Sequence, residues 1–257
     1  MKTLATYNIK GGVGKTSAAV NLAALAAADG VRTLLWDLDP QAAATYLFRI
    51  RPRVKGGARS LISGRRDLED AIKSTDQDGL DLLPADFSYR NMDLQLDDVK
   101  RPARRLRRLL QPLAGDYDLI VLDCPPSISL VSENVFAAAD LLLVPLIPAT
   151  LSERTFDALT EFVSQIDGPR PEIRAFFSMV DGRKRLHAEV MTSLRARYSI
   201  VLSTSIPAES NVERMGLTRE PVVITHPQSR ASLAYAELWQ ECRPLLQLAE
   251  ATPGSAT

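Results

Sequence analysis

The chain has 257 residues, of which 46% are apolar and 24% are charged, and its 31 basic side chains balance its 31 acidic ones. This length fits one large globular domain, or at most two small ones, with a sizeable core. Because the formal net charge is +0, any surface for a polyanion must be a local patch. Only two cysteines are present, Cys124 and Cys242, which argues against a disulfide scaffold or a cysteine-based zinc site and favours a reducing compartment.

Apolar, strand-like runs alternate with helical patterns along the chain. This alternation predicts an α/β fold: a mostly parallel, twisted sheet with helices on both faces. We expect one domain over 1–250 and a frayed tail over 251–257. The expected strands cover 3–9, 31–36, 81–83, 119–122, 141–146 and 175–180. The expected helices cover 15–28, 102–113, 152–166, 186–198 and 230–249.

No targeting or membrane segment is expected. The N-terminal residues run straight into a glycine-rich motif, unlike a signal peptide. The longest apolar run, 141–149, is broken by Pro145 and Pro148 and falls well short of the roughly 20 residues that a membrane span needs. The sequence therefore predicts a cytoplasmic protein.

The strongest local signal is a glycine-rich motif between the first expected strand and the first expected helix. Glycines let the backbone curl so that its N–H groups surround phosphate oxygens, and the helix N-terminus adds its positive end. A lysine then reaches the β- and γ-phosphates, and a threonine hydroxyl binds Mg²⁺. The candidate nucleotide-binding residues here are Lys10, Gly11, Gly12, Val13, Gly14, Lys15, Thr16 and Ser17.

This motif departs from the general P-loop pattern, which would place a glycine where the chain has Ile9. With Lys10 before the glycines and Asn8-Ile9 leading in, it resembles the deviant Walker A motif of the ParA/Soj/MinD family of P-loop ATPases. The resemblance implies a fold of the P-loop NTPase type that binds ATP and Mg²⁺. It also implies that Lys10 crosses a dimer interface to the partner's nucleotide.

Two acidic motifs follow expected strands. Asp37 and Asp39 end the second strand, and Asp123 ends the strand at 119–122. Ligands of open α/β sheets lie beyond the carboxyl ends of the strands, so both motifs should face the glycine-rich loop. Turn-forming roles are the alternative, most of all for Asp37.

The resemblance assigns roles to these residues. Asp39 would orient the attacking water in switch I, and residues 123–127 would form switch II. The resemblance thus implies Asp39, Lys10 and Lys15 as catalytic residues, and Thr16, Asp123 and Asp39 as residues at the metal. The segments 79–85, 177–183 and 203–207 extend the similarity over nearly the whole chain. Within them, Met179 and Pro207 are candidate contacts to the base, or else a core methionine and a turn proline.

The chain is most similar to the short, Soj-like members, because the motif begins at residue 11 and leaves no room for an N-terminal DNA-binding extension. The resemblance implies an ATP-dependent homodimer that binds double-stranded DNA nonspecifically and associates with the nucleoid. A ParB-like or cargo-adaptor protein would stimulate hydrolysis and so position a DNA or protein cargo. Slow intrinsic turnover is expected, since the sequence shows no arginine finger in cis.

Basic residues offer several candidate DNA contacts. By analogy with the family, Arg214, Arg219 and Arg230 in the C-terminal part are the candidates. The densest basic run, 100–108, belongs to an expected amphipathic helix whose arginines would face solvent. A second basic segment, 49–66, contains glycines and is expected to be a loop with a short helix.

Three alternatives stay open. A MinD-like membrane regulator would need a basic amphipathic C-terminal helix, which Glu237, Glu241 and Pro244 disfavour. A metabolic or metal-handling P-loop enzyme would need a second substrate site or several thiolates, whereas Cys124 stands alone. A scaffold that binds ATP without hydrolysing it is disfavoured by the presence of Lys10, Asp39 and Asp123.

Overall fold

The computed structural model describes residues 1–99, 104–166 and 168–248. The described residues form one eight-stranded sheet with the order β3-β4-β2-β5-β1-β6-β7-β8. Neighbouring strands are parallel except at the edge, where β3 pairs antiparallel with β4. The strands are β1 (Lys2–Thr6), β2 (Thr33–Asp37), β3 (Lys73–Ser74), β4 (Leu80–Leu83), β5 (Leu119–Asp123), β6 (Leu141–Leu146), β7 (Glu172–Val180) and β8 (Val201–Pro207).

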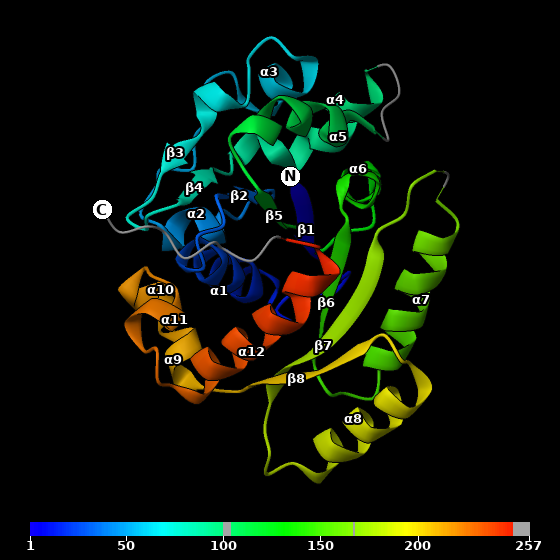
Figure 1. Ribbon diagram of the computed structural model, residues 1–257. Coiled ribbons are helices and arrows are strands. Elements are labelled where there is room, and N and C mark those ends of the chain that lie inside the picture. Colours follow the sequence, from blue (N-terminus) through cyan, green and yellow to red (C-terminus); the bar gives the residue numbers. More distant parts are fainter. Residues whose placement is uncertain (100–103, 167, 249–257) are drawn as a thin grey trace.

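Helices cover both faces of this sheet. Figure 1 shows α1 and α12 together on one side and α4, α5 and α6 grouped on the other. The first side carries α1 (Lys15–Ala28), α2 (Ala43–Leu47), α9 (Ser210–Glu213), α10 (Met215–Thr218), α11 (Val222–Thr225) and α12 (Arg230–Leu245). The second carries α3 (Gly57–Ser63), α4 (Met92–Asp97), α5 (Arg105–Leu110), α6 (Leu130–Ala138), α7 (Ser152–Ser164) and α8 (Arg185–Arg197).

The central strands are apolar throughout because each of their faces is covered. In β5, Leu119 and Val121 pack into the core under α1, whereas Ile120 and Leu122 pack into the core under α6. The predicted α/β fold with a mostly parallel sheet is therefore confirmed. In the described part of the chain, no helix is both long and apolar enough to cross a membrane.

Several expected boundaries were wrong. The first strand ends at Thr6 rather than residue 9, because the chain turns there into the glycine-rich loop. The helix expected over 102–113 begins outside the described residues. Its described part is α5, followed by a 3₁₀ turn over Gln111–Gly115, because Pro112 has no N–H to continue an α-helix. The last helix ends at Leu245, and the expected tail at 251–257 lies outside the described residues.

Several regular elements were not expected, among them α6 and β8. Helix α6 follows Asp123 and its loop, and at its start the Ser129 N–H donates to the Ser132 hydroxyl at 2.8 Å. Strand β8 is an edge strand with the polar sequence Ser203-Thr204-Ser205, so it lacks the apolar run of a buried strand.

Candidate nucleotide site

The parallel register brings the glycine-rich loop and the acidic motifs to one edge of the sheet. Asp123, the last residue of β5, is in register with Thr6 on one side and Asp37 on the other. The loop 7–14 leaves β1 at the same edge and leads into α1. The carboxyl ends of three neighbouring strands thus supply the loop and the two aspartates, as the sequence predicts.

Backbone geometry requires glycine at two positions of this loop. Gly12 has a φ of 70° and Gly14 a φ of 92°, in the left-handed region that L-residues rarely adopt. A Cβ on Gly14 would also lie 2.6 Å from the Ser178 hydroxyl on β7. Gly14 immediately precedes the first turn of α1, whose free N–H groups form a ready site for an anion.

Asn8 fixes the start of the loop. Its side-chain amide donates to the Pro145 carbonyl at 2.8 Å, and its Oδ1 accepts from the Lys10 N–H at 2.9 Å. The Lys15 ammonium, in turn, donates to the Lys10 carbonyl at 3.0 Å, while the Lys10 side chain is exposed. The two lysines of the motif are therefore placed differently, one folded inward and one in solvent.

Lys15 is 7% exposed. Burial lowers its pKa, and the neighbouring carboxyl group of Asp123 acts in the opposite direction. A cation held in a partly desolvated loop interacts more strongly with an anionic ligand than a cation in free solution does.

Asp37 is completely buried but well hydrogen-bonded. Its Oδ2 accepts from the Thr45 N–H at 2.8 Å and from the Thr45 hydroxyl at 2.7 Å, and its Oδ1 accepts from the Asp39 N–H at 3.2 Å. Burial raises the pKa of Asp37 to about 6, although the bonds from Thr45 oppose the change. Its contacts are those of a side chain that holds the first turn of α2 on the end of β2.

Asp123 is buried to the same extent, but neither of its carboxylate oxygens accepts a hydrogen bond from the described residues. Burial raises its pKa well above the usual range, and the charge of Asp37 adds to this. The Thr16 hydroxyl is near enough to lower the same pKa. Buried carboxylate oxygens without partners are costly unless a ligand satisfies them.

Asp39 lies in the loop between β2 and α2. It is half-buried, and its Oδ1 accepts from the Gln41 N–H at 2.9 Å. Ala42, which follows, has a φ of 58°, an unfavourable value for alanine. Strained backbone of this kind is common in ligand-binding loops, and no sequence signal pointed to Ala42.

Cys124 follows Asp123 and is 1% exposed, and burial raises the pKa of its thiol well above the usual value. Cys242 is buried in the core on the opposite face of the sheet, so the two thiols occupy different cores. Both are neutral core side chains in this environment.

Met179 and Pro207 line a hollow beside the glycine-rich loop. Met179 is 40% exposed with a φ of 57°, and Pro207 ends β8. Sequence reasoning missed several of its lining residues, among them Glu209 and Tyr235, which carry no local motif and come from distant parts of the chain. The lining also includes Gly14, Ser17, Ser178 and Val212.

The three C-terminal arginines have different surroundings. Arg214 and Arg230 are exposed. Arg219 instead lies over the Tyr46 ring, 4.4 Å from its centroid, and donates to the Tyr46 carbonyl at 3.0 Å. Arg219 thus joins α10 to α2.

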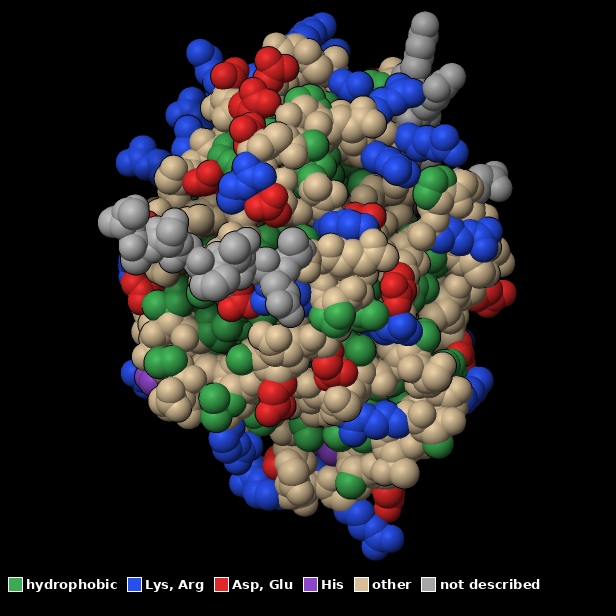
Figure 2. Space-filling model, viewed as in Figure 1, with side chains coloured by type: hydrophobic (Ala, Val, Ile, Leu, Met, Phe, Trp, Pro, Cys, Tyr) green, Lys and Arg blue, Asp and Glu red, His purple; other side chains and the backbone are tan. Residues whose placement is uncertain are grey.

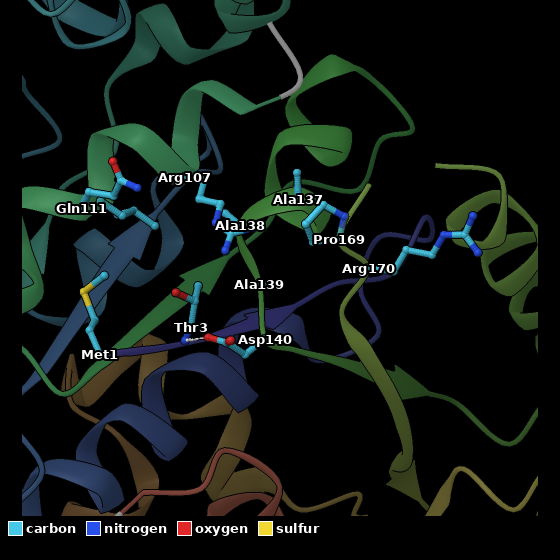
Figure 3. A pocket seen from close by; sticks show the side chains of 11 residues that line it. Met1, Thr3, Arg107, Gln111, Ala137, Ala138, Ala139, Asp140, Pro169 and Arg170 are labelled. Carbon is cyan, nitrogen blue, oxygen red and sulfur yellow. Dashed lines mark hydrogen bonds between the residues drawn. The ribbon is translucent and has the colours of Figure 1, made fainter. Parts of the chain in front are cut away.

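A second hollow lies at the opposite, amino edge of the sheet. Figure 3 shows Met1, Arg107 and Arg170 around it, with Asp140 bonded to the Thr3 N–H at 2.8 Å. None of the predicted site residues lines it.

Comparison with known proteins shows which family and which relatives this chain is similar to. Residues 1–174 match a family model described as an AAA domain. The chain is 32% identical over 249 residues to the chromosome partitioning protein ParA of Caulobacter vibrioides, covering 94% of this chain and 93% of that protein. It is 28% identical over 249 residues to the sporulation initiation inhibitor protein Soj of Bacillus subtilis, covering 93% of this chain and 97% of that protein.

A solved structure shares the fold over nearly its full length. Cobyrinic acid a,c-diamide synthase from Mycobacterium smegmatis, with bound ATP analogue and magnesium, superposes with a TM-score of 0.79 at 29% identity and covers 95% of each chain. The resemblance suggested by the motif around Lys10 is thereby confirmed, and the chain belongs to the ParA/Soj/MinD family of P-loop ATPases.

Proposed function

We propose that the chain binds ATP with Mg²⁺ at the carboxyl edge of β1, β2 and β5 and hydrolyses it slowly as a homodimer. The observation that carries this proposal is Asp123, a buried carboxylate without hydrogen-bond partners among the described residues, next to Lys15 and Thr16. The solved relative with bound ATP analogue and magnesium supports the choice of ligand.

The glycine-rich loop and the first turn of α1 would hold the phosphates, since the first N–H groups of an α-helix have no partner within the helix. Lys15 would exchange its bond to the Lys10 carbonyl for the β- and γ-phosphates. Thr16 and Asp123 fit Mg²⁺, because a hydroxyl and an unpaired carboxylate are the oxygen ligands it prefers. When bound, Mg²⁺ would neutralise charge that develops on the phosphates.

Asp39 would orient the attacking water, and its loop position leaves it half-exposed for that role. The exposed Lys10 would contact the nucleotide held by the partner protomer. Met179 and Pro207 would contact the base, because their hollow also includes Gly14 and Ser17. Asp39 would lie near the metal, as its charge already acts on Asp123.

The ATP-bound dimer would bind double-stranded DNA without sequence preference and associate with the nucleoid. A ParB-like or cargo-adaptor protein would then stimulate hydrolysis, release the DNA and so position a DNA or protein cargo. The sequence similarity to a chromosome partitioning protein and to Soj favours this reading. Arg214 and Arg230, both exposed, are the candidate DNA contacts, and Arg219 contributes from its place on Tyr46.

Packing of the last helix favours DNA over membrane. The apolar stripe of α12, which includes Ala234, Leu238 and Cys242, is buried against α1 and the sheet. A membrane-binding amphipathic helix would need that stripe free.

Fluorescence anisotropy with random-sequence duplex DNA tests the proposal. We expect salt-sensitive binding with ATP, little binding with ADP or without nucleotide, and loss of ATP-dependent binding in Lys15→Gln. A protein that hydrolyses ATP yet binds no DNA in any nucleotide state would refute the DNA-positioning function. In that case anionic vesicles and then protein partners become the next ligands to measure.

A further inference from the structure

The segment 49–66, which follows α2 and includes α3, is strongly basic. It contains seven Lys and Arg residues and no Asp or Glu. Its exposed basic side chains are Arg49, Arg51, Arg53, Lys55, Arg59 and Arg65. Figure 2 shows Lys and Arg side chains projecting from the upper left rim, the region of α3 and β3 in Figure 1, with acidic side chains beside them.

The segment is firmly attached to the domain. The Val54 N–H donates to Asp86 Oδ2 at 2.8 Å, and the Ala58 N–H donates to the Ser88 hydroxyl at 2.8 Å. Four of its apolar side chains are buried in the core under α4 and α6: Val54, Ala58, Leu61 and Ile62. The basic side chains are therefore displayed on an ordered backbone.

Ion pairs account for only the two ends of the segment. Arg49 pairs with Asp76 and Glu220, and Arg66 pairs with Asp70. Among the described residues, no salt bridge involves the cations between them, although Arg53 lies close enough to Asp86 to lower the pKa of that carboxyl. The unpaired cations are Arg51, Arg53, Lys55, Arg59 and Arg65.

The segment also adjoins the C-terminal arginines. Arg49 donates to the Thr218 carbonyl at 3.1 Å, and Arg219 donates back to the Tyr46 carbonyl at 3.0 Å. The start of the basic segment and the end of α10 thus meet across α2. Asp86, which anchors the segment, follows β4, whose carboxyl end lies at the same edge as the nucleotide site.

We propose that segment 49–66 binds the phosphate backbone of duplex DNA and extends the surface of the C-terminal arginines. The inference rests on the proposed function and assigns to it a surface that the family resemblance does not. Cations spaced along an ordered chain neutralise phosphates without reading sequence. A membrane surface is a poorer fit, because all apolar side chains of the segment except Pro52 pack against a core and leave little to insert between lipids.

The test compares two triple variants with the same change of charge. The first is Arg51→Gln, Arg53→Gln and Lys55→Gln within the segment. The control is Arg104→Gln, Arg107→Gln and Arg108→Gln, whose exposed side chains lie at and before α5, with Arg107 at the amino edge (Figure 3). ATP-dependent binding to random duplex DNA is measured for each over a salt series, and thermal unfolding and ATPase activity show that each variant is folded.

We expect the segment variant to lose about tenfold to a hundredfold in affinity and to reduce the salt slope by about three for each bound protomer. The control should stay within about threefold of the wild type, because it lies outside the DNA surface. Equal losses in the two variants, or no loss in the segment variant, would overturn the inference while leaving the proposed function intact.

Two further outcomes distinguish a failure of the proposed function from a failure of the inference alone. If the wild type binds no DNA in any nucleotide state, both the proposed function and this inference fail. If the segment variant keeps its DNA affinity but loses binding to vesicles of phosphatidylglycerol and phosphatidylcholine, the basic segment is a membrane surface and the inference is overturned.

Discussion

The ends of β2 and β5 form an informative pair. Asp37 and Asp123 are in register on neighbouring strands, and both are completely buried. Asp37 accepts three hydrogen bonds, from Thr45 and Asp39, whereas Asp123 accepts none from the described residues. Two aspartates at equivalent positions thus differ in their hydrogen bonding: the carboxylate of Asp37 has partners, and that of Asp123 has none among the described residues.

The difference separates a structural carboxylate from one that needs a ligand. Asp37 completes a local structure, since its bonds hold the first turn of α2 against the sheet. The Asp123 carboxylate accepts no hydrogen bond from the described residues, and a buried carboxylate of this kind is unfavourable without a cation. The same edge of the sheet therefore contains one carboxylate that stabilises the fold, Asp37, and one that needs a ligand, Asp123.

The largest effect is expected at Asp39, two residues after Asp37. Asp39→Ala should lower ATP turnover by at least about a hundredfold, because a water-orienting carboxylate acts in the reaction itself. ATP binding should be retained, as Asp39 is not part of the glycine-rich loop. Steady-state turnover and nucleotide affinity measured on the same preparation check this, and unchanged turnover would remove Asp39 from the reaction.

Substitution of Asp37 should act on stability. Asp37→Ala should lower the free energy of unfolding by about 2–3 kcal/mol, because the buried Thr45 N–H and hydroxyl lose their acceptor. Chemical denaturation without nucleotide measures the change. Asp37→Asn is the matched control and should cost less, since an amide oxygen still accepts from Thr45; equal losses would contradict the hydrogen-bond explanation.

Asp123→Asn should change the free energy of unfolding in the opposite direction from Asp37→Asn. Without nucleotide, Asp123→Asn should raise the free energy of unfolding at pH 8 by about 1 kcal/mol, because it removes a carboxyl group whose ionised form is destabilised by burial and by Asp37. Denaturation of Asp37→Asn and Asp123→Asn under identical conditions measures the contrast. A loss of stability in Asp123→Asn would mean that Asp123 is already satisfied in the free protein.

A smaller effect concerns Asp86, the acid that anchors the basic segment after β4. Burial raises its pKa, but hydrogen bonds from Ser88 and from the Val54 N–H outweigh burial and lower the pKa overall. A lowered pKa means that the stabilising contribution is present above about pH 4 and is lost as the pH falls through the folded pKa.

Asp86→Asn should therefore lower the free energy of unfolding by less than about 1 kcal/mol at pH 7, given its partial exposure to solvent. The difference from the wild type should shrink below about pH 4, where the wild-type carboxyl is also protonated. Denaturation curves between pH 3 and 7 measure this difference. If the difference in unfolding free energy between the wild type and Asp86→Asn grew as the pH fell, the stabilising role of the ionised Asp86 carboxylate would be contradicted.

The sequence predicted those features that depend on neighbours along the chain. The glycine-rich motif 11–16 at the junction of a strand and a helix, and Asp123 after an apolar run, are local patterns, and the parallel register brings them together. The difference between Asp37 and Asp123 could not be predicted, because it depends on how Thr45 folds back onto β2. Glu209 and Tyr235 were missed for the same reason, as they reach the site only through the packing of α12 and the exit from β8.

The surface was the least predictable part. Arg219 was a candidate DNA contact by analogy with the family, and its position on the Tyr46 ring had no signal in the sequence. Segment 49–66 was expected to be a loop with a short helix, and α3 agrees with this. Its attachment through Asp86 and Ser88 depends on contacts some 30 residues away along the chain.

Calorimetric titration with ATP, in Mg²⁺ and in EDTA, tests the central claim that this edge of the sheet is a Mg²⁺–ATP site completed at Asp123. The wild type and Asp37→Asn should bind ATP more tightly with Mg²⁺, whereas Asp123→Asn should bind with an affinity that Mg²⁺ no longer improves. An Asp123→Asn protein whose ATP affinity depends on Mg²⁺ as strongly as that of the wild type would contradict the assignment of the metal to this carboxylate.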